Sequence, residues 1–493
     1  MSGAQQAAAP PQGMRRIPLP LESYQHASQP LSAKRLINLM AEQQPADART
    51  EAALVPAPGL ATLLTVGPGP IRAINADTPG RIYVVSGDHF YRLSFAPRAV
   101  GNGIEDLGLV GLPTDPAPVS NYAVVTIASG SNAAVVCVPP NAFTCGHNAA
   151  AVEGADTLHQ IGGDFPNVSS VAYLDGYFAF SDADVPERWH ITGLFDPAAY
   201  DALDFASTEA QPNVLRRILS RAGELWMFGE GGIEIWYDAG NADFPFRRYP
   251  NGVISCGVVN KTIAQIDHSF WWLGVDGIVY RSEGYKAVRV STHAIEQLIY
   301  ATGSYPQWVI GGNGYAYTWR GHACYALSVG AHTFVYDCAT KLWHERSSAI
   351  SGTGLWRPLC ATQSLGDTLL GDSRSGQIFF PANGASDAGV EPLRQFTLPP
   401  LWAGTRRAFC ARLEIEMEVG QAASHGDVLL EWSDDGGWTW TGRRTLSAGD
   451  VGQLRKRVVT TRLGSFRQRV FRVSCHRAST FYAVDADITG GAS

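Results

Sequence analysis

Hydrophobic residues along most of this 493-residue chain occur in short runs and not at helical spacing. From about residue 63 onward, runs of β-branched and aromatic residues alternate with Gly, Asp and Asn turn residues. This pattern is typical of strands joined by tight hairpins. The hydrophobic pattern therefore predicts an all-β protein.

One apolar strand pattern recurs along the chain and indicates the architecture. Its copies are centred on Tyr83, Val135, Tyr173, Trp226, Trp272, Tyr325 and Leu369. Neighbouring copies are 38 to 53 residues apart, close to the spacing of about 40 to 50 residues between the blades of a propeller. The repeat predicts a β-propeller of six to eight blades, with seven favoured. A set of stacked β-sandwiches or a β-solenoid is the alternative.

A different pattern begins near Pro399. Apolar and charged residues alternate strictly between residues 406 and 420, which indicates a strand with one buried face. Three further strand-like runs follow, and together they predict a C-terminal β-sandwich. We therefore expect four parts, namely a flexible, extended N-terminal arm (1–30), a short connecting segment (31–62), a propeller (63–398) and the sandwich (399–493).

The composition fits a turn-rich β protein and narrows the range of functions. The 38 basic and 45 acidic residues leave a net charge of -7, which argues against the overall basic charge that drives nucleic-acid binding. No apolar stretch reaches the length of a membrane span, and the N-terminus lacks a signal-peptide pattern. The eight cysteines include no CxxC pair, which indicates reduced thiols. We expect a soluble protein that does not insert into membranes.

The familiar catalytic and ligand-binding motifs are missing from the sequence. It contains no GxSxG, no GxxxxGK[ST], no strand-linked GxGxxG and no HExxH, the motifs of nucleophilic serines, phosphate loops, dinucleotide sites and zinc sites. We therefore predict no catalytic residues, no cofactor, no metal ligands and no enzymatic activity.

The sharpest local motif is SDDGGWTW (433–440), which has the S-x-D-x-G-x-T-W spacing of an Asp-box. We expect a structural turn that starts at Ser433, in which Asp435 accepts hydrogen bonds from backbone amides, Gly437 adopts a positive φ and Trp440 anchors the hairpin. The motif resembles the Asp-boxes of sialidases, so a propeller-type glycosidase or a glycan-binding tail protein stays open as an alternative. A glycosidase would also need two converging carboxylates.

Positive charge is concentrated near the C-terminus. Between residues 443 and 477, ten Lys or Arg residues accompany a single acid, Asp450. Such a run predicts a basic face that contacts DNA phosphates or an acidic patch on another subunit. The alternative is a solvated sheet face whose charges pair with neighbouring acids such as Glu414 and Glu416. The candidate interface residues are Arg455, Lys456, Arg457, Arg467, Arg469 and Arg472.

Several segments together resemble one protein family. They include KRLINLMAEQ (34–43), LVPAPGL (54–60), IRAI (71–74), and the longer stretches 173–213, 223–248, 288–299 and 463–475. Along these segments the chain is similar to the packaged-DNA stabilisation proteins of short-tailed bacteriophages, also called tail accessory or tail nozzle proteins.

The resemblance implies a structural virion protein that makes and breaks no bonds. It implies a homo-hexameric ring below the portal and its adaptor protein, with a propeller outside a tubular platform formed by residues 31–62 and 399–493. Such a ring seals packaged DNA, lets genomic double-stranded DNA pass through its lumen during ejection, and docks tail fibre, spike or needle proteins. The implied location is the virion tail, after assembly in the bacterial host cytoplasm. A monomeric propeller scaffold is the remaining alternative.

Overall fold

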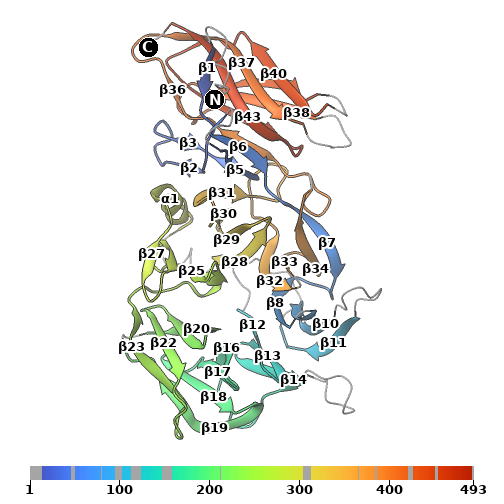
Figure 1. The fold of residues 1–493 in the computed structure, drawn as a ribbon, viewed down its shortest axis with the longest axis vertical. Helices are drawn as coiled ribbons and strands as arrows, with labels where there is room; N and C mark the ends of the chain where they lie inside the picture. Colours follow the sequence, from blue (N-terminus) through green and yellow to red (C-terminus); the bar gives the residue numbers. More distant parts are fainter. Residues whose placement is uncertain are drawn as a thin grey trace, which may run out of the picture.

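A computed structural model describes the chain from residue 14 to residue 490, with internal gaps. The described ranges are 14–45, 50–78, 80–94, 103–112, 124–146, 158–210, 213–303, 312–364, 366–383, 386–419, 426–449 and 453–490. The molecule is elongated, with a propeller at one end and a β-sheet platform at the other (Figure 1). The first and last described strands, near the two ends of the chain, both lie in the platform (Figure 1).

The propeller consists of groups of four antiparallel strands. Six groups are separate four-stranded sheets, and a seventh begins a ten-stranded sheet that continues into the platform. The first blade contains β8 (Ile71–Thr78), β9 (Arg81–Ser86), β10 (His89–Ser94) and β11 (Gly103–Leu109), and the second contains β12 (Thr126–Ser129), β13 (Ala133–Val138), β14 (Asn141–Gly146) and β15 (His159–Gln160). The third blade contains β16 (Val168–Leu174), β17 (Tyr177–Asp182), β18 (Arg188–Gly193) and β19 (Asp196–Ser207). The fourth contains β20 (Leu215–Arg221), β21 (Glu224–Gly229), β22 (Ile233–Asp238) and β23 (Phe246–Ile254).

The remaining blades complete the circle. The fifth blade contains β24 (Ala264–Ile266), β25 (Ser269–Leu273), β26 (Val279–Ser282) and β27 (Ala287–Arg289). The sixth contains β28 (Asn313–Trp319), β29 (His322–Val329), β30 (His332–Asp337) and β31 (Leu342–Arg346). The seventh contains β32 (Pro358–Ser364), β33 (Asp367–Asp372), β34 (Gln377–Ala382) and β7 (Gly59–Thr65). The predicted all-β propeller is therefore confirmed, and the repeat in the sequence corresponds to the blades of the structure.

The last blade takes its outer strand from the beginning of the chain. β7 pairs antiparallel with β34, so that Leu64 lies opposite Ile378. Because this pairing joins residues more than three hundred positions apart, it closes the ring and leaves no open edge between the first and last blades. The short helices α1 (His293–Ala301) and η2 (Asn260–Thr262) lie in the connections before β28 and β24.

Polar side chains on the innermost strands tie neighbouring blades together. They bond to the backbone of the next blade in the pairs Asn75 Nδ2 to Ile127 O (3.3 Å), Val171 N to Thr126 Oγ1 (3.0 Å), Ile218 N to Ser170 Oγ (3.1 Å), Asn313 Nδ2 to Leu359 O (2.7 Å) and Ala76 N to Thr362 Oγ1 (3.0 Å). Inner strands expose one backbone edge to the central cavity, so these bonds satisfy groups that no further strand pairs.

The platform combines strands from both ends of the chain in two large sheets, beside a separate two-stranded sheet of β2 and β3. One has the order β40-β37-β43-β6-β5, with β1 and β41 attached, and the other continues from β31 through β4-β35-β42-β38-β39. The strands are β1 (Met14–Ile17), β2 (Tyr24–Gln25), β3 (Ala33–Lys34), β4 (Leu36–Ile37), β5 (Leu39–Gln43), β6 (Ala52–Pro56), β35 (Arg394–Thr397), β36 (Leu401–Trp402), β37 (Ala408–Glu418), β38 (Asp427–Ser433), β39 (Gly442–Ser447), β40 (Arg455–Thr461), β41 (Ser465–Phe466), β42 (Gln468–Cys475) and β43 (Thr480–Thr489).

A single hydrophobic core holds the platform together. It joins Ile17 and Leu54 from the N-terminal strands to Leu413 of β37 and Val484 of β43. The alternation in residues 406–420 is visible directly, since Leu413, Ile415 and Met417 are fully buried. Strands from both ends of the chain therefore contribute to one core.

Part of the predicted flexible arm is ordered. Residues 1–13 lie outside the described residues, but β1 pairs with β43 from Met14 onward. Arg16 donates two hydrogen bonds to Asp485, at 2.9 and 3.0 Å, and Ile17 enters the core. The sequence did not predict this strand, because β1 is only four residues long and lies in an Ala-, Gln- and Pro-rich segment.

Candidate functional site

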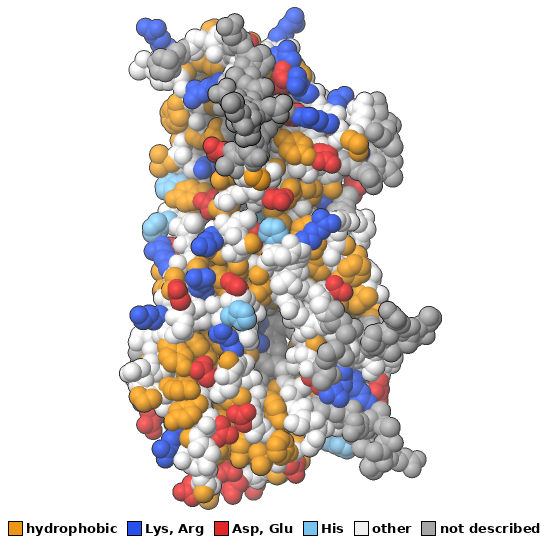
Figure 2. Space-filling view, in the orientation of Figure 1, with side chains coloured by type: hydrophobic (Ala, Val, Ile, Leu, Met, Phe, Trp, Pro, Cys, Tyr) orange, Lys and Arg blue, Asp and Glu red, His pale blue; other side chains and the backbone are white. Residues whose placement is uncertain are grey.

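Among the described residues, the predicted basic face lies on the terminal strands of the two platform sheets. β39 and β40 are the last strands of their sheet orders. Arg443 and Arg444 on β39, and Arg455 and Arg457 on β40, are exposed. Figure 2 shows Lys and Arg side chains gathered at this end of the molecule. An exposed strand edge leaves backbone donors and acceptors available for another chain.

Acidic neighbours neutralise part of this face. Arg455 forms a salt bridge with Glu416, and Arg457 Nε lies 3.6 Å from Glu414 Oε2 on the adjacent strand β37. The side chains of Arg455 and Arg457 remain 61% and 59% exposed. Lys456 is half-buried. The cross-strand acidic partners expected in the second alternative are therefore present, and contact of this face with DNA or another subunit stays a prediction.

Arg467, Arg469 and Arg472 occupy three different environments. Arg467 is exposed. Arg469 is 2% exposed and binds Asp434 through Nε (2.6 Å) and Nη2 (2.7 Å), so it is a buried structural ion pair and not an interface residue of this surface. Arg472 is half-buried, pairs with Glu431 at 2.8 Å and stacks on Trp440 with its guanidinium 3.9 Å from the ring centroid.

The Asp-box forms the turn that its spacing indicated. Thr439 N donates to Asp435 Oδ1 (2.9 Å), and Gly437 N donates to Ser433 Oγ (2.8 Å). Gly437 has φ +110°, and Trp440 is held under Arg472. Slight burial raises the pKa of Asp435, but hydrogen bonds from Ser433, Thr439 and the turn amides outweigh it and lower that pKa to about 2. The turn packs on Pro30 and Ala33 of the N-terminal segment.

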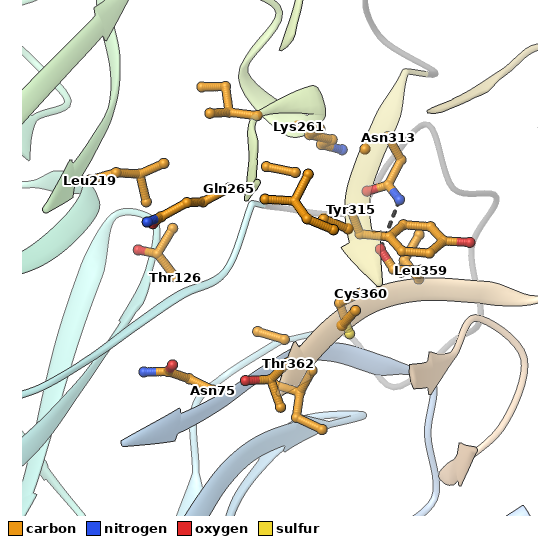
Figure 3. Close-up of a pocket in the computed structure, with 18 of the residues that line it drawn as sticks. Asn75, Thr126, Leu219, Lys261, Gln265, Asn313, Tyr315, Leu359, Cys360 and Thr362 are labelled. Atoms are coloured by element: carbon orange, nitrogen blue, oxygen red, sulfur yellow. Dashed lines mark hydrogen bonds between the residues drawn. The ribbon is translucent and has the colours of Figure 1, made fainter. Parts of the chain in front are cut away.

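The centre of the propeller contains a cavity of about 720 Å³ that the sequence did not indicate. Its walls come from the inner strands of several blades. Figure 3 shows Lys261, Thr126 and Thr362 around it, together with the hydrogen bond from Asn313 to Leu359. The only acidic residue among its described lining residues is Asp267. A pair of carboxylates of the kind that hydrolyses glycosides is therefore not found among those lining residues.

Other kinds of site were also sought in the described ranges. They contain no group of three or more His, Cys, Asp or Glu side chains arranged to hold a metal ion. None of their helices is both long and apolar enough to span a membrane. The eight cysteines are all free thiols. The basic platform face and the propeller cavity are thus the two features that merit a functional account.

Comparison with known proteins identifies the family. No curated protein sequence matches the chain. The family description "Bacteriophage P22 Gp10, beta-propeller" matches residues 15–380, and "Bacteriophage P22 Gp10, beta-sandwich" matches residues 394–490. The chain belongs to the phage P22 Gp10 family. This Gp10-family protein is accordingly a structural protein of the phage tail and DNA-stabilisation class, with a C-terminal β-sandwich.

Some solved structures resemble this Gp10-family protein at low identity. The WD40 propeller domain of Doa1 is 11% identical, covers 66% of this chain and 97% of its own, and superposes with a TM-score of 0.41. The N-terminal domain of Nup159 is 8% identical, covers 71% of this chain and 99% of its own, and gives a TM-score of 0.40.

Proposed function

We propose that this protein assembles as a homo-hexameric ring below the phage portal and its adaptor, where it seals packaged DNA and extends the channel for genome ejection. The observation that carries the proposal is the placement of the exposed cationic strands β39 and β40 at the open edges of the platform. A closed ring needs two different complementary patches on each subunit. The basic face supplies one of them.

Large apolar side chains on the platform support the same role. Trp402, Phe409, Trp438 and Leu454 are 61%, 56%, 59% and 64% exposed. Exposed aromatic and aliphatic side chains beside arginines are typical of protein interfaces. We therefore assign the basic face to an adaptor or a neighbouring subunit. Arginines lining the lumen would retard the genome electrostatically.

The far end of the propeller suits the docking of other tail proteins. On β19, Leu203 and Phe205 are 81% and 38% exposed and alternate with aspartates. Figure 2 shows acidic and hydrophobic side chains gathered at this end. A fibre, spike or needle protein with basic and apolar residues would complement this strand.

We also propose that the protein has no enzymatic activity. The support is chemical, because the cavity at the centre of the propeller has a single carboxylate among its described lining residues, whereas glycoside hydrolysis uses two. Incubation with a panel of host polysaccharides should release no sugar, and sugar release would restore the glycosidase alternative.

A phage deleted for this chain tests the proposal directly. We expect its heads to package DNA and then lose it, so that empty particles accumulate, and we expect the chain supplied in trans to restore full particles. Full, infectious particles formed without the chain would contradict the proposal.

A further inference from the structure

The platform ends, on the side away from the propeller, in a surface that we call the platform tip. β36 and the C-terminal end of β43 lie there (Figure 1). Figure 2 shows Lys and Arg side chains at this end of the molecule. The exposed side chains that define the tip are those of Trp402, Arg406, Arg407, Phe409, Arg462 and Arg467.

Strand pairing brings these residues together from two segments of the chain. β37 pairs with β41 so that Phe409 lies opposite Ser465. Continued outward by two residues, this antiparallel register places Arg407 opposite Arg467. The carbonyl oxygen of Arg467 also accepts a hydrogen bond of 2.8 Å from Ala403 N. The connection between β36 and β37 therefore folds around Arg467.

Trp402 and Arg462 flank this pair of arginines. Trp402 lies opposite Gln468, where β36 pairs with β42, and Gln468 directly follows Arg467. Arg462 N donates a hydrogen bond of 2.9 Å to Ala411 O on β37. The tip is thus a single surface that combines arginines with two exposed aromatic side chains.

The four arginines of the tip have no acidic partner in the part of the chain that the structure describes. Their side chains form no ion pair or hydrogen bond with the described residues. Arg455 on β40, by contrast, forms a salt bridge with Glu416. The segments that contribute the tip residues, 399–413 and 451–480, contain no Asp or Glu. The tip therefore differs from the basic face on β40, where acids on β37 pair with the arginines.

The placement of these arginines is unfavourable for folding. Like charges on directly opposite positions of neighbouring strands destabilise a sheet, and Arg407 and Arg467 have this arrangement. Arg462 has φ +59°, in the left-handed region that is strained for most side chains. Natural proteins break such local rules at functional sites. We infer that the tip arginines serve binding and not the fold.

We propose that the platform tip binds an acidic, partly apolar surface on a different virion protein. This inference rests on the proposed function and names the adaptor as that protein. The opposite end of the molecule, at β19, has the acidic and apolar surface that we assign to a fibre, spike or needle protein. The positive tip is the complementary surface left for the adaptor.

The aromatic side chains favour a protein over DNA at this surface. Trp, Phe and Arg are enriched at protein interfaces, and buried aromatic side chains contribute much of the binding energy there. DNA phosphates would engage the arginines but would leave Trp402 and Phe409 in water. The tip of a second copy has the same positive charge, so two tips would repel each other.

Site-specific photocross-linking in assembled virions tests the proposal. Trp402→benzoylphenylalanine, carried by a chain that complements the deleted phage, should cross-link on irradiation to the protein that links the ring to the portal. Mass spectrometry should locate the cross-link beside clustered Asp or Glu residues. Phe380→benzoylphenylalanine is the matched control, because Phe380 on β34 of the propeller is also an exposed aromatic residue, at 37%. It should not cross-link to that protein.

Three results of the cross-linking experiment would overturn the proposal. They are a cross-link from the Trp402 variant to another copy of this chain, a cross-link to DNA, and no cross-link at all. Phe409→benzoylphenylalanine replaces the Trp402 variant if that variant gives no particles.

Neutralising the opposed arginines separates binding from folding. Arg407→Gln together with Arg467→Gln should remove the cross-link and lower the yield of full particles about tenfold or more. The melting temperature of this double variant should stay the same or rise, because the repulsion between the two strands is gone. Arg407→Lys together with Arg467→Lys keeps both charges and should restore the cross-link. An unchanged cross-link in the Gln variant, or a lower melting temperature, would contradict a binding role.

These outcomes can be told apart from failure of the proposed function. Full, infectious particles formed without the chain would contradict the proposed function itself. If the chain is present in virions and is needed for full particles, but the tip cross-links elsewhere, only the inference about the tip fails.

Discussion

Arg35 and Glu345 form a salt bridge of 2.6 Å between the N-terminal segment and β31. Glu345 is almost fully buried, accepts two hydrogen bonds from Arg35, and also accepts one from Ser23 Oγ at 3.1 Å. These three residues join blade and platform at the place where β31 pairs with β4. The junction between the two parts of the molecule is thus a specific ionic contact inside a continuous sheet.

Glu345→Gln should destabilise the protein by about 3 kcal/mol, because it leaves the Arg35 guanidinium without its counter-charge in a largely buried site. Thermal unfolding at neutral pH measures the loss. Arg16→Met is the control, since Arg16 is 33% exposed and pairs with Asp485 at the outer edge of the platform. That substitution should cost less than about 1 kcal/mol. If the two variants lost equal unfolding free energy, the Arg35–Glu345 pair would contribute no more to stability than the exposed Arg16–Asp485 pair.

The stabilising effect of Glu345 should disappear in acid. Burial alone would raise the pKa of Glu345, but the charge of Arg35 and hydrogen bonds from His332 and Arg35 hold it well below its usual range. A depressed pKa stabilises the folded state above the ordinary value of about 4.5, and the stabilisation declines as pH falls toward the folded value. The difference in melting temperature between the wild type and Glu345→Gln should therefore be constant near neutral pH and shrink below about pH 4.5. A difference that grows in acid would contradict this assignment.

Substitution by Met should destabilise the protein much more at the buried Arg469 than at the exposed Arg467. Arg469→Met removes a buried guanidinium that binds Asp434 and donates to Leu463 O at 2.6 Å, and the lost hydrogen bonds should cost about 1–3 kcal/mol. Arg467→Met changes an exposed side chain and should cost less than about 0.5 kcal/mol. Chemical denaturation of both variants checks this, and a large effect of Arg467→Met would argue against its exposed position.

Gly437 in the Asp-box turn and Gly464 in the connection between β40 and β41 form a matched pair for substitution. Gly437 and Gly464 both have positive φ, so alanine costs about 1–2 kcal/mol at each for backbone strain. A Cβ at Gly437 would also lie 2.8 Å from the Cβ of Ala33, whereas nothing lies within 4 Å at Gly464. Gly437→Ala should therefore lower the melting temperature more than Gly464→Ala does. Equal shifts would mean that the turn does not pack tightly on the N-terminal segment.

Reversal of charge on β39 should block assembly without harming the fold. Arg443 and Arg444 are exposed, so replacing both by Glu should change stability by less than about 1 kcal/mol. The variant chain should nevertheless fail to restore full particles to a phage deleted for this protein. Arg374→Glu, an exposed charge reversal in the β33–β34 turn of the propeller, is the control and should restore them. Full complementation by the β39 variant would remove this strand from the interface.

The sequence predicted the architecture well because hairpin chemistry is local. Asp175 and Gly176 have φ values of +49° and +97° in the two-residue turn between β16 and β17, as their residue types indicated. Most strands of the apolar repeat form the second strand of a blade. Each of these features depends on residues a few positions apart, so the sequence pattern was sufficient to find it.

Features that depend on distant residues were not visible in the sequence. Arg469 carries the same charge as Arg467, and only the position of Asp434, thirty-five residues away, shows that it is buried. The lining of the propeller cavity comes from several blades, from Asn75 of β8 to Thr362 of β32, and no pattern along the chain indicates that these strands surround one space. The formation of strand β1 likewise depends on its pairing with β43, which lies near the other end of the chain.

Cryo-electron microscopy of the assembled virion tests the central claim most directly. We predict a closed ring of six copies of this chain below the portal and its adaptor, with the platforms around the channel, β39 and β40 in contact with a neighbouring subunit or the adaptor, and the propellers outside. A virion whose DNA exit channel contains no copy of this chain would contradict the account.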